Sequence, residues 1–202
     1  SVPPPGGRGS LRARAQLPPV GALRPAPPVA SRGASVPYDG VNTAEARAMA
    51  QGEPLSFLRV TRSEIDLPDA VSPYDDAVYA RAVENLRALR SVAPLEVDAE
   101  PTLYFYRQQM GDHVQTGLAG CFSVDEYEHD LVKKHEKTRP DKEDDAPRPI
   151  LGVGAQTGVV FLTYGARAAV DAIALRACAG PLLYDFTASD GIRHTVWPVS
   201  SS

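Results

Sequence analysis

Helix-type and strand-type segments follow one another in an irregular order along this chain, and that order most limits the folds open to it. Cap residues, turn residues and the spacing of apolar side chains mark the two kinds of segment. A strict alternation of strand and helix is typical of a doubly wound parallel sheet, whereas an irregular order favours the α+β class. We therefore expect an α+β fold in which a mixed sheet with hairpins packs against several helices.

The expected helices begin at residues whose side chains can cap them. Asn42 with Glu45, and Ser123 with Glu126, have the three-residue spacing of a capping box. Ser72 followed by a proline marks a third start, and apolar residues recur at helical spacing from there to the next proline. The sequence predicts helices over residues 42–52, 72–93, 123–135 and 170–179. In the second, Tyr79, Val83, Leu86 and Leu89 or Arg90 recur at helical spacing, and in the last, Val170, Ile173, Ala174 and Ala177 should face inward.

Two pairs of the expected strands are joined by turns and should form hairpins. Residues 103–106 and 114–122 flank a turn at Gly111-Asp112, and residues 182–186 and 192–197 flank one at Asp190-Gly191. Asp-Gly and Gly-Asp pairs suit the tight turns of hairpins because glycine accepts a positive φ. Residues 56–60 and 159–163 are further apolar segments of strand type.

The first part of the chain has a different composition from the rest. Residues 1–20 are rich in proline and glycine, include three arginines, and precede the first acidic residue, Asp39. Such a segment buries too little apolar surface to offset the entropy of ordering it, so we expect a disordered leader. The family-type domain is then expected over residues 21–202.

Charge, hydropathy and cysteine content exclude several classes of protein. The formal net charge of −4 argues against a general nucleic-acid-binding surface. No apolar run approaches the roughly 20 residues that cross a bilayer, so no membrane partner is expected. Cys121 and Cys178 stand outside any CxxC pair, which favours a reducing cytoplasm, although a single bridge between the two stays open.

The densest group of polar side chains spans residues 133–145. Residue types alone favour a solvated helix end, because lysines complement the helix dipole there. The alternative interpretation is a site. His135 continues the stripe of Tyr127 and Leu131, which would turn it toward the body of the protein.

In that interpretation the cations bind phosphate and the other groups carry the chemistry. Lys134 and Arg139 would hold phosphate, Arg139 through its bidentate fork. His135 or Glu136 would act as a base. Asp141 or Glu143, in the same segment, could hold magnesium, but no spacing in the chain marks a protein-built metal site.

Three other patterns are weaker. The triplets at residues 115–117 and 156–158 both read Gln-Thr-Gly and pair an amide and a hydroxyl with a glycine, although structural turns are the favoured interpretation. Arg193 and His194 should point to opposite faces of a strand, so only one of them can face a given pocket. Pro37-Tyr38-Asp39 is either an ordinary turn or a carboxylate placed at a cleft.

Several of these segments together resemble a bacterial family catalogued as domain of unknown function 1015. The segments that carry the resemblance are Ala22-Leu23-Arg24-Pro25, Pro37-Tyr38-Asp39, residues 53–58, residues 64–68, Tyr106-Arg107-Gln108, Gln115-Thr116-Gly117, residues 133–143, residues 155–158, Tyr184-Asp185-Phe186 and residues 190–197. Their order and spacing cover about residues 22–199. Arg59 departs from the pattern, since the family usually has histidine there.

Members of this family are usually longer and carry an Asp-Gly-His-His-Arg motif beyond this region. The sequence given stops at Ser202, so we expect the amino-terminal part of a family domain, truncated at its carboxyl end. The motif resembles one in ParB/sulfiredoxin-like proteins, a group that includes free serine kinases. By the same likeness, residues 135–139 resemble a nucleotide-contacting segment of ParB.

The resemblance implies a nucleotide-dependent phosphotransferase that acts on a small hydroxylated metabolite such as serine, with ATP or ADP and magnesium as cofactors. The residues expected to serve it are His135 and Glu136 in catalysis and Lys134, Arg139, Gln156 and Thr157 in cofactor binding. Two other functions stay open. One is a non-catalytic, ParB-like nucleotide-binding or interaction module, and the other is a structural fragment without a ligand.

Overall fold

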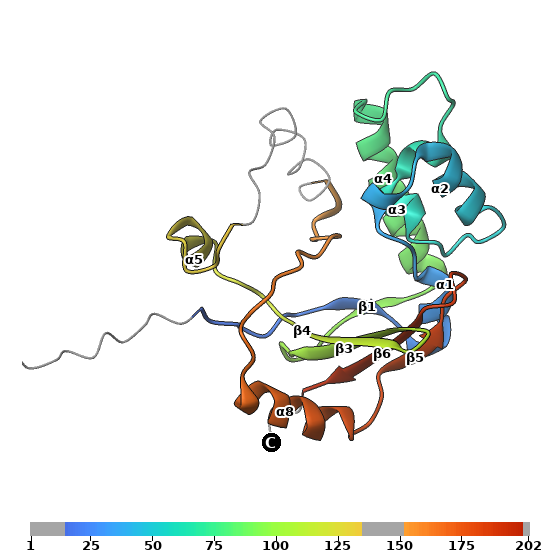
Figure 1. Cartoon of the computed structure of the whole chain (residues 1–202). Coiled ribbons are helices and arrows are strands. Elements are labelled where there is room, and N and C mark those ends of the chain that lie inside the picture. Colours follow the sequence, from blue (N-terminus) through green and yellow to red (C-terminus); the bar gives the residue numbers. More distant parts are fainter. Residues whose placement is uncertain (1–14, 135–151, 200–202) are drawn as a thin grey trace, which may run out of the picture.

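The computed structural model describes residues 15–134 and 152–199. Figure 1 shows a group of helices, α1 to α4, beside one end of a four-stranded sheet, with helix α8 under the opposite face of that sheet. The expected α+β class is confirmed. Among the described residues no helix has the length and hydropathy needed to cross a membrane.

The four-stranded sheet has the order β4-β3-β6-β5. Its strands are β3 (Tyr104–Met110), β4 (His113–Ala119), β5 (Tyr184–Thr187) and β6 (Arg193–Pro198). Both expected hairpins are confirmed, because β3 pairs with β4 and β5 pairs with β6. β3 and β6 also pair antiparallel and join the two hairpins. The pairings among the described strands are therefore all antiparallel, and no parallel pair gives the sheet the mixed character that was expected.

A short two-stranded ribbon connects the sheet to the start of the chain. β1 (Leu23–Pro25) pairs with β2 (Leu95–Val97), and the Arg24 guanidinium lies 2.6 Å from the Asp98 carboxylate just beyond β2. Residues 15–20, which were expected within the disordered leader, also make contacts: Val20 pairs with Thr102 and the amide of Cys121 donates to the carbonyl of Pro18. Residues 1–14 lie outside the described part.

Helix α2 (Thr43–Ala50) begins where the sequence predicts it. The Asn42 side chain accepts from the Glu45 amide at 2.9 Å, and the Glu45 carboxylate accepts from the Asn42 amide at 2.8 Å. This reciprocal capping box satisfies two amides that the helix itself cannot pair. It fixes α2 so that Ala46 and Ala50 enter the core.

Helix α4 (Asp76–Val92) starts later than expected, because Asp75 and not Ser72 is its cap. The Ser72 hydroxyl accepts from the Tyr74 amide, which places it in the turn before the helix. Val78, Ala82, Leu86 and Leu89 are the buried positions of the helix, whereas Tyr79 and Val83, at the spacing that the sequence singled out, are half-buried.

The strand expected over residues 56–60 is wrong. The chain forms α3 (Leu58–Thr61) and the 3-10 turn η3 (Ser63–Asp66) instead. Leu58 is only 2% exposed and packs with Ala46, Ala50 and Ile65. Burial in this tertiary cluster outweighs the weak strand preference of this five-residue segment.

The helix expected over residues 123–135 is much shorter in the structure. α5 (Val124–Glu128) is capped by Ser123, whose side chain accepts from the Glu126 amide, but it ends at His129. Asp130 then takes a positive φ of 58°, which turns the chain away from a helical path. Residues 129–134 are therefore not helical, and His135 lies outside the described residues.

The remaining elements are helix α8, the segment that precedes it, and three short elements near the start of the chain. Helix α8 (Ala168–Cys178) is confirmed, with Val170, Ala174 and Ala177 half-buried and Ile173 exposed. The strand expected over residues 159–163 is wrong, since that segment has neither helix nor strand structure. The short elements are η1 (Pro27–Val29), α1 (Ala30–Gly33) and η2 (Tyr38–Gly40).

Candidate functional site

Three of the six residues expected to form the site lie within the described part of the chain. Lys134 has local contacts: its Nζ atom is 3.9 Å from the Asp130 carboxylate and lies 4.9 Å from the ring centre of Tyr127. Its side chain is 40% exposed. His135, Glu136 and Arg139 lie outside the described residues.

The two Gln-Thr-Gly triplets are on different parts of the molecule. Gln156 donates from Nε2 to the Gly158 carbonyl at 2.7 Å, which is a local turn, and Thr157 is half-buried. A Cβ atom at Gly158 would lie 3.8 Å from Cε1 of Tyr38, so this triplet lies beside the helices. The triplet at residues 115–117 lies on β4. No contact between described residues joins Lys134 to either triplet.

A row of polar side chains crosses all four strands of the sheet. Arg107 on β3 pairs in register with Thr116 of β4 on one side and with Thr195 of β6 on the other. Thr195 pairs in turn with Asp185 of β5. Residues in register share a face of a sheet, so these four side chains form one row, which we call the polar row.

The contacts within the polar row hold Arg107 in place. Its Nε atom donates to the Thr116 hydroxyl at 3.1 Å, and its guanidinium lies 4.8 Å from the ring centre of Trp197. A cation over an indole face is attracted by the ring quadrupole. Trp197 is itself only 4% exposed, so it gives the guanidinium a fixed support.

The far end of the polar row carries an ion pair. Arg193 on β6 binds both carboxylate oxygens of Asp185, at 2.8 and 2.7 Å. The Thr195 hydroxyl adds a third donor at 3.3 Å. These bonds, chiefly those from Arg193, hold the pKa of Asp185 below its usual value, so it is a carboxylate that accepts and not an acid that donates.

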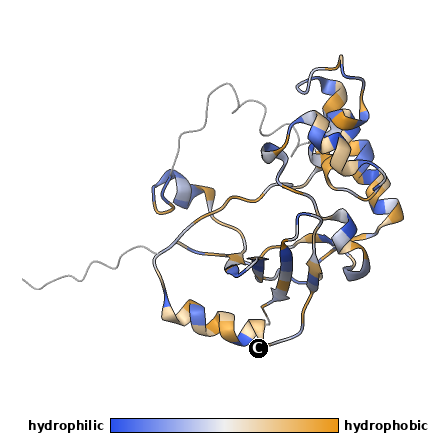
Figure 2. Ribbon diagram, turned by 45° about the vertical axis from the view of Figure 1, so that its right-hand side comes forward, coloured by the Kyte–Doolittle hydropathy of each residue, from blue (hydrophilic) through white to orange (hydrophobic). Residues whose placement is uncertain are grey.

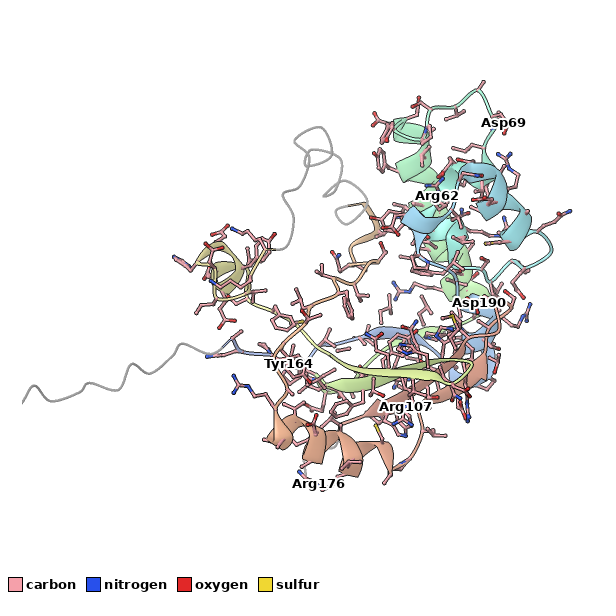
Figure 3. The ribbon with its side chains drawn as sticks, viewed as in Figure 1. Arg62, Asp69, Arg107, Tyr164, Arg176 and Asp190 are labelled. Atoms are coloured by element: carbon pink, nitrogen blue, oxygen red, sulfur yellow. The ribbon has the colours of Figure 1, made fainter. Side chains whose placement is uncertain are left out.

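Three members of the polar row, Arg107, Thr195 and Asp185, line a cavity of about 310 Å³ between the sheet and the end of α8. Figure 3 shows Arg107 on the side of the sheet that α8 covers. The cavity is lined by Arg107, Gln109, Cys178, Gly180, Leu182, Asp185, Arg193, Thr195 and Trp197. The charged residues of this lining are Arg107, Arg193 and Asp185, so the lining has a net formal charge of +1.

Arg107 supplies that charge. Among residues 15–134 and 152–199 no carboxylate pairs with it, whereas Arg193 is neutralised by Asp185. Cys178 also lines the cavity, but its thiol is a weak nucleophile, because burial raises its pKa. Cys121 and Cys178 are both free thiols, so the bridge that the sequence left open is absent.

A family model described as "Protein of unknown function (DUF1015)" matches residues 17–202. The chain belongs to this family. Comparison with curated proteins and with solved structures found no match. In this DUF1015 chain, segments that carried the resemblance meet at the polar row: Arg107 comes from residues 106–108, Asp185 from residues 184–186, and Arg193, Thr195 and Trp197 from residues 190–197.

Arg107 and Asp185 lie in segments that carry the family resemblance, but neither was predicted to belong to a site. A usable signal was present, because Arg107 and Gln109 alternate with Tyr106 and Gln108 and therefore share one strand face. Arg193 and His194 do point to opposite faces, as expected. Arg193 lines the cavity, and His194 stacks on Phe186 across the other side of the sheet.

The described residues offer no alternative metal site. Within residues 15–134 and 152–199 no three histidine, cysteine, aspartate or glutamate side chains gather closely enough to hold an ion. Asp141 and Glu143, which the sequence suggested as magnesium ligands, lie outside the described part. The polar row is thus the best candidate for a binding site in this chain.

Proposed function

We propose that this DUF1015 chain binds a small phosphate-bearing ligand at the polar row, as part of a nucleotide-dependent phosphotransferase that acts on a hydroxylated metabolite such as serine. The observation that carries the binding proposal is Arg107. It is a cation without an acidic partner among the described residues, supported by Thr116 and Trp197, in a cavity.

Arg107 has the properties that phosphate binding needs. A guanidinium donates two parallel hydrogen bonds to phosphate, and each charge-assisted bond is stronger than a neutral one. Because Thr116 uses only Nε, the two terminal nitrogens have no hydrogen bond to a described residue. Gln109 lines the same cavity, and the second hydrogen of its amide can donate to a further phosphate oxygen.

The size of the cavity limits the ligand. About 310 Å³ is at the lower end of the range for small-molecule sites. It suits a phosphorylated metabolite, or the phosphate part of a nucleotide whose remaining atoms lie outside. The leucine and cysteine side chains at its rim can contact a short carbon chain.

The transfer step is proposed from the family resemblance and the remaining site residues. By the resemblance, Lys134, Arg139, Gln156 and Thr157 would contact ATP or ADP with magnesium, and His135 or Glu136 would take the proton of the acceptor hydroxyl. Lys134, Gln156 and Thr157 do not line the cavity at the polar row, so this step rests on the resemblance alone. Phosphoryl transfer depends mainly on positioning and on neutralising phosphate charge, which such cations supply.

A non-catalytic, ParB-like nucleotide-binding or interaction module is the second candidate. One observation favours it: the single carboxylate that lines the cavity, Asp185, already accepts three hydrogen bonds. In the described residues the cavity therefore has a phosphate-binding cation but no free general base. A module that only binds a ligand requires the cation and no general base.

The test is calorimetric titration of the full chain with phosphoserine, inorganic phosphate, ADP and ATP, the nucleotides with and without magnesium. Arg107→Gln should weaken binding of the phosphate ligand at least tenfold, since it removes a charge-assisted contact of about 1.5–3 kcal/mol. Arg176→Gln, at an exposed arginine of α8, is the matched control and should bind like wild type.

Two results separate the parts of the proposal. Equal phosphate affinity in wild type and Arg107→Gln would rule out the polar row as the site. Binding without phosphoserine in the products, after incubation with ATP, magnesium and serine, would favour the non-catalytic module over the phosphotransferase.

A further inference from the structure

The segment between Gly158 and Gly165 leaves an unusual amount of apolar surface uncovered. Val159 is 98% exposed, Val160 76% and Phe161 67%. Figure 2 shows orange, hydrophobic stretches along this open segment before it enters α8. Contiguous exposed apolar residues of this kind mark an interaction surface more often than scattered ones do.

The composition of the segment is that of a strand. Valine, phenylalanine, leucine, threonine and tyrosine fill it, with a glycine at each end and neither charge nor proline between. β-branched and aromatic residues favour strands. Yet no backbone hydrogen bond between described residues joins residues 159–165 to another part of the chain.

The sheet offers the complementary feature, an open edge. β4 is the last strand on its side of the described sheet, so its outward amides and carbonyls lack a described partner strand. Natural edge strands are protected by charged residues, prolines or bulges. The sequence of β4, His113–Ala119, contains no lysine, arginine, acidic residue or proline, and Val114 is 50% exposed.

The two features cannot readily meet within one chain. Gly158 lies against Tyr38 beside the helices, and α8 begins at Ala168 and contacts β3 and β6 beneath the sheet. The segment between these two positions descends past the sheet toward α8, with Tyr164 near its lower end (Figure 3). Because its two ends lie on opposite sides of the sheet, the segment crosses the sheet and does not run alongside β4 (Figure 1).

We propose that residues 159–163 of one copy of this chain pair with the outer edge of β4 of a second copy. The other edge of the described sheet, β5, is only four residues long, contains Asp185 and contacts α1. The longer β4 edge and the unpaired segment at residues 159–163 therefore complement each other, and a two-fold arrangement uses both features twice and closes as a dimer. Main-chain hydrogen bonds would supply the affinity, as in other cases of strand addition. This dimer does not depend on the phosphate ligand or on the proposed reaction.

The experiment measures the mass of the full chain in solution over a hundredfold range of concentration, together with amide hydrogen exchange. The proposal predicts a monomer–dimer equilibrium and slower exchange at residues 159–163 and 113–119 as concentration rises. Two proline variants, Val160→Pro and Phe161→Pro, test the pairing. Successive amides of a strand point to opposite edges, so at least one of the two variants removes a hydrogen bond to β4.

At least one proline variant should be monomeric over the range in which wild type dimerises. Neither proline removes a backbone hydrogen bond found in the described monomer, so both variants should keep its folded circular dichroism. Leu175→Lys changes an equally exposed apolar residue, 76%, on α8 and should dimerise like wild type.

Three results would overturn the proposal. One is a monomer at every concentration with fast exchange at residues 159–163. Another is a monomer with slow exchange there, which would mean that the segment pairs within its own chain. The third is a dimer that both proline variants leave intact.

Discussion

The hydroxyl of Tyr106 and Nδ1 of His194 lie 2.6 Å apart, on the face of the sheet opposite the polar row. The ring of Phe186 stacks on His194 with 5.3 Å between the ring centres. Burial lowers the pKa of His194, and the nearby Asp190 opposes this only in part. The imidazole is therefore neutral at pH 7, and one hydrogen bond joins its Nδ1 to the Tyr106 hydroxyl.

This lowered pKa predicts that acid weakens the fold through His194. Between the folded pKa and the unfolded value of 6.5, the unfolded chain binds more protons, so stability falls as pH decreases through that window. Urea unfolding from pH 8 to pH 5 should show the loss. His194→Phe keeps an aromatic ring stacked on Phe186 but cannot be protonated, so it should remove the part of the stability loss that comes from His194.

The titration of the His194 ring by NMR gives a direct check on the sign. A folded pKa at or above 6.5 would contradict the prediction. Tyr106→Phe removes the hydroxyl without changing the ring, and should cost about 1 kcal/mol at neutral pH.

Asp185→Asn should strengthen phosphate binding while slightly weakening the fold. The ion pair with Arg193 is partly exposed, 27% on the acid and 54% on the arginine, so its loss should cost the fold little stability. Without the carboxylate, Arg193 joins Arg107 as an uncompensated cation in the cavity. We expect about threefold to tenfold tighter phosphate binding, with the gain shrinking at high salt.

Calorimetric titration at two salt concentrations measures this effect. A loss of affinity in Asp185→Asn would show instead that the carboxylate contacts the ligand. Because Arg107 is unchanged in this variant, the result is independent of the Arg107→Gln test.

Two glycines near the end of β4 should respond very differently to alanine. A Cβ atom at Gly120 would lie 2.6 Å from a methyl group of Leu103 and 2.9 Å from the Pro18 carbonyl oxygen. A Cβ atom at Gly117 would meet nothing within 4 Å. Gly120→Ala should cost about 1–3 kcal/mol through overpacking, and Gly117→Ala should be neutral or mildly stabilising.

Urea unfolding of the two variants provides the comparison. The result also reports on residues 17–18, since the Gly120 contacts come largely from that segment. Equal stability of both variants would mean that residues 17–18 do not pack against β4 as the structure has them.

The parts of the fold that local chemistry determines were predictable. The capping box at Asn42 and Glu45 and the two hairpin turns depend on residues within a few positions of each other. The helix around Leu58 was not, because its position depends on Ala46 and Ile65, which a local pattern does not bring together. The same holds for β3 and β6, whose pairing joins residues about 90 positions apart.

The candidate site was predictable only in its pieces. Opposite faces for Arg193 and His194 were predicted and are confirmed, but Thr116, Arg107 and Asp185 are brought together only by the register of the strands. The register is defined between paired strands, so it cannot be predicted from any one segment alone. The expected cluster at His135 also relied on one long helix, which Asp130 ends by its backbone turn.

The start of α4 gives a last test of local chemistry against tertiary structure. Both Ser72 and Asp75 are residues that cap helices well, but only the Asp75 side chain accepts from an amide of the helix, that of Ala77 at 2.9 Å. Asp75→Ala should therefore cost about 1 kcal/mol of stability, and it also removes a favourable charge at the positive end of the helix dipole. Ser72→Ala removes only an exposed turn contact at 3.3 Å and should cost less than about 0.5 kcal/mol. Urea unfolding of the two variants decides between the residues, because a larger loss for Ser72→Ala would mean that the helix begins at the earlier serine.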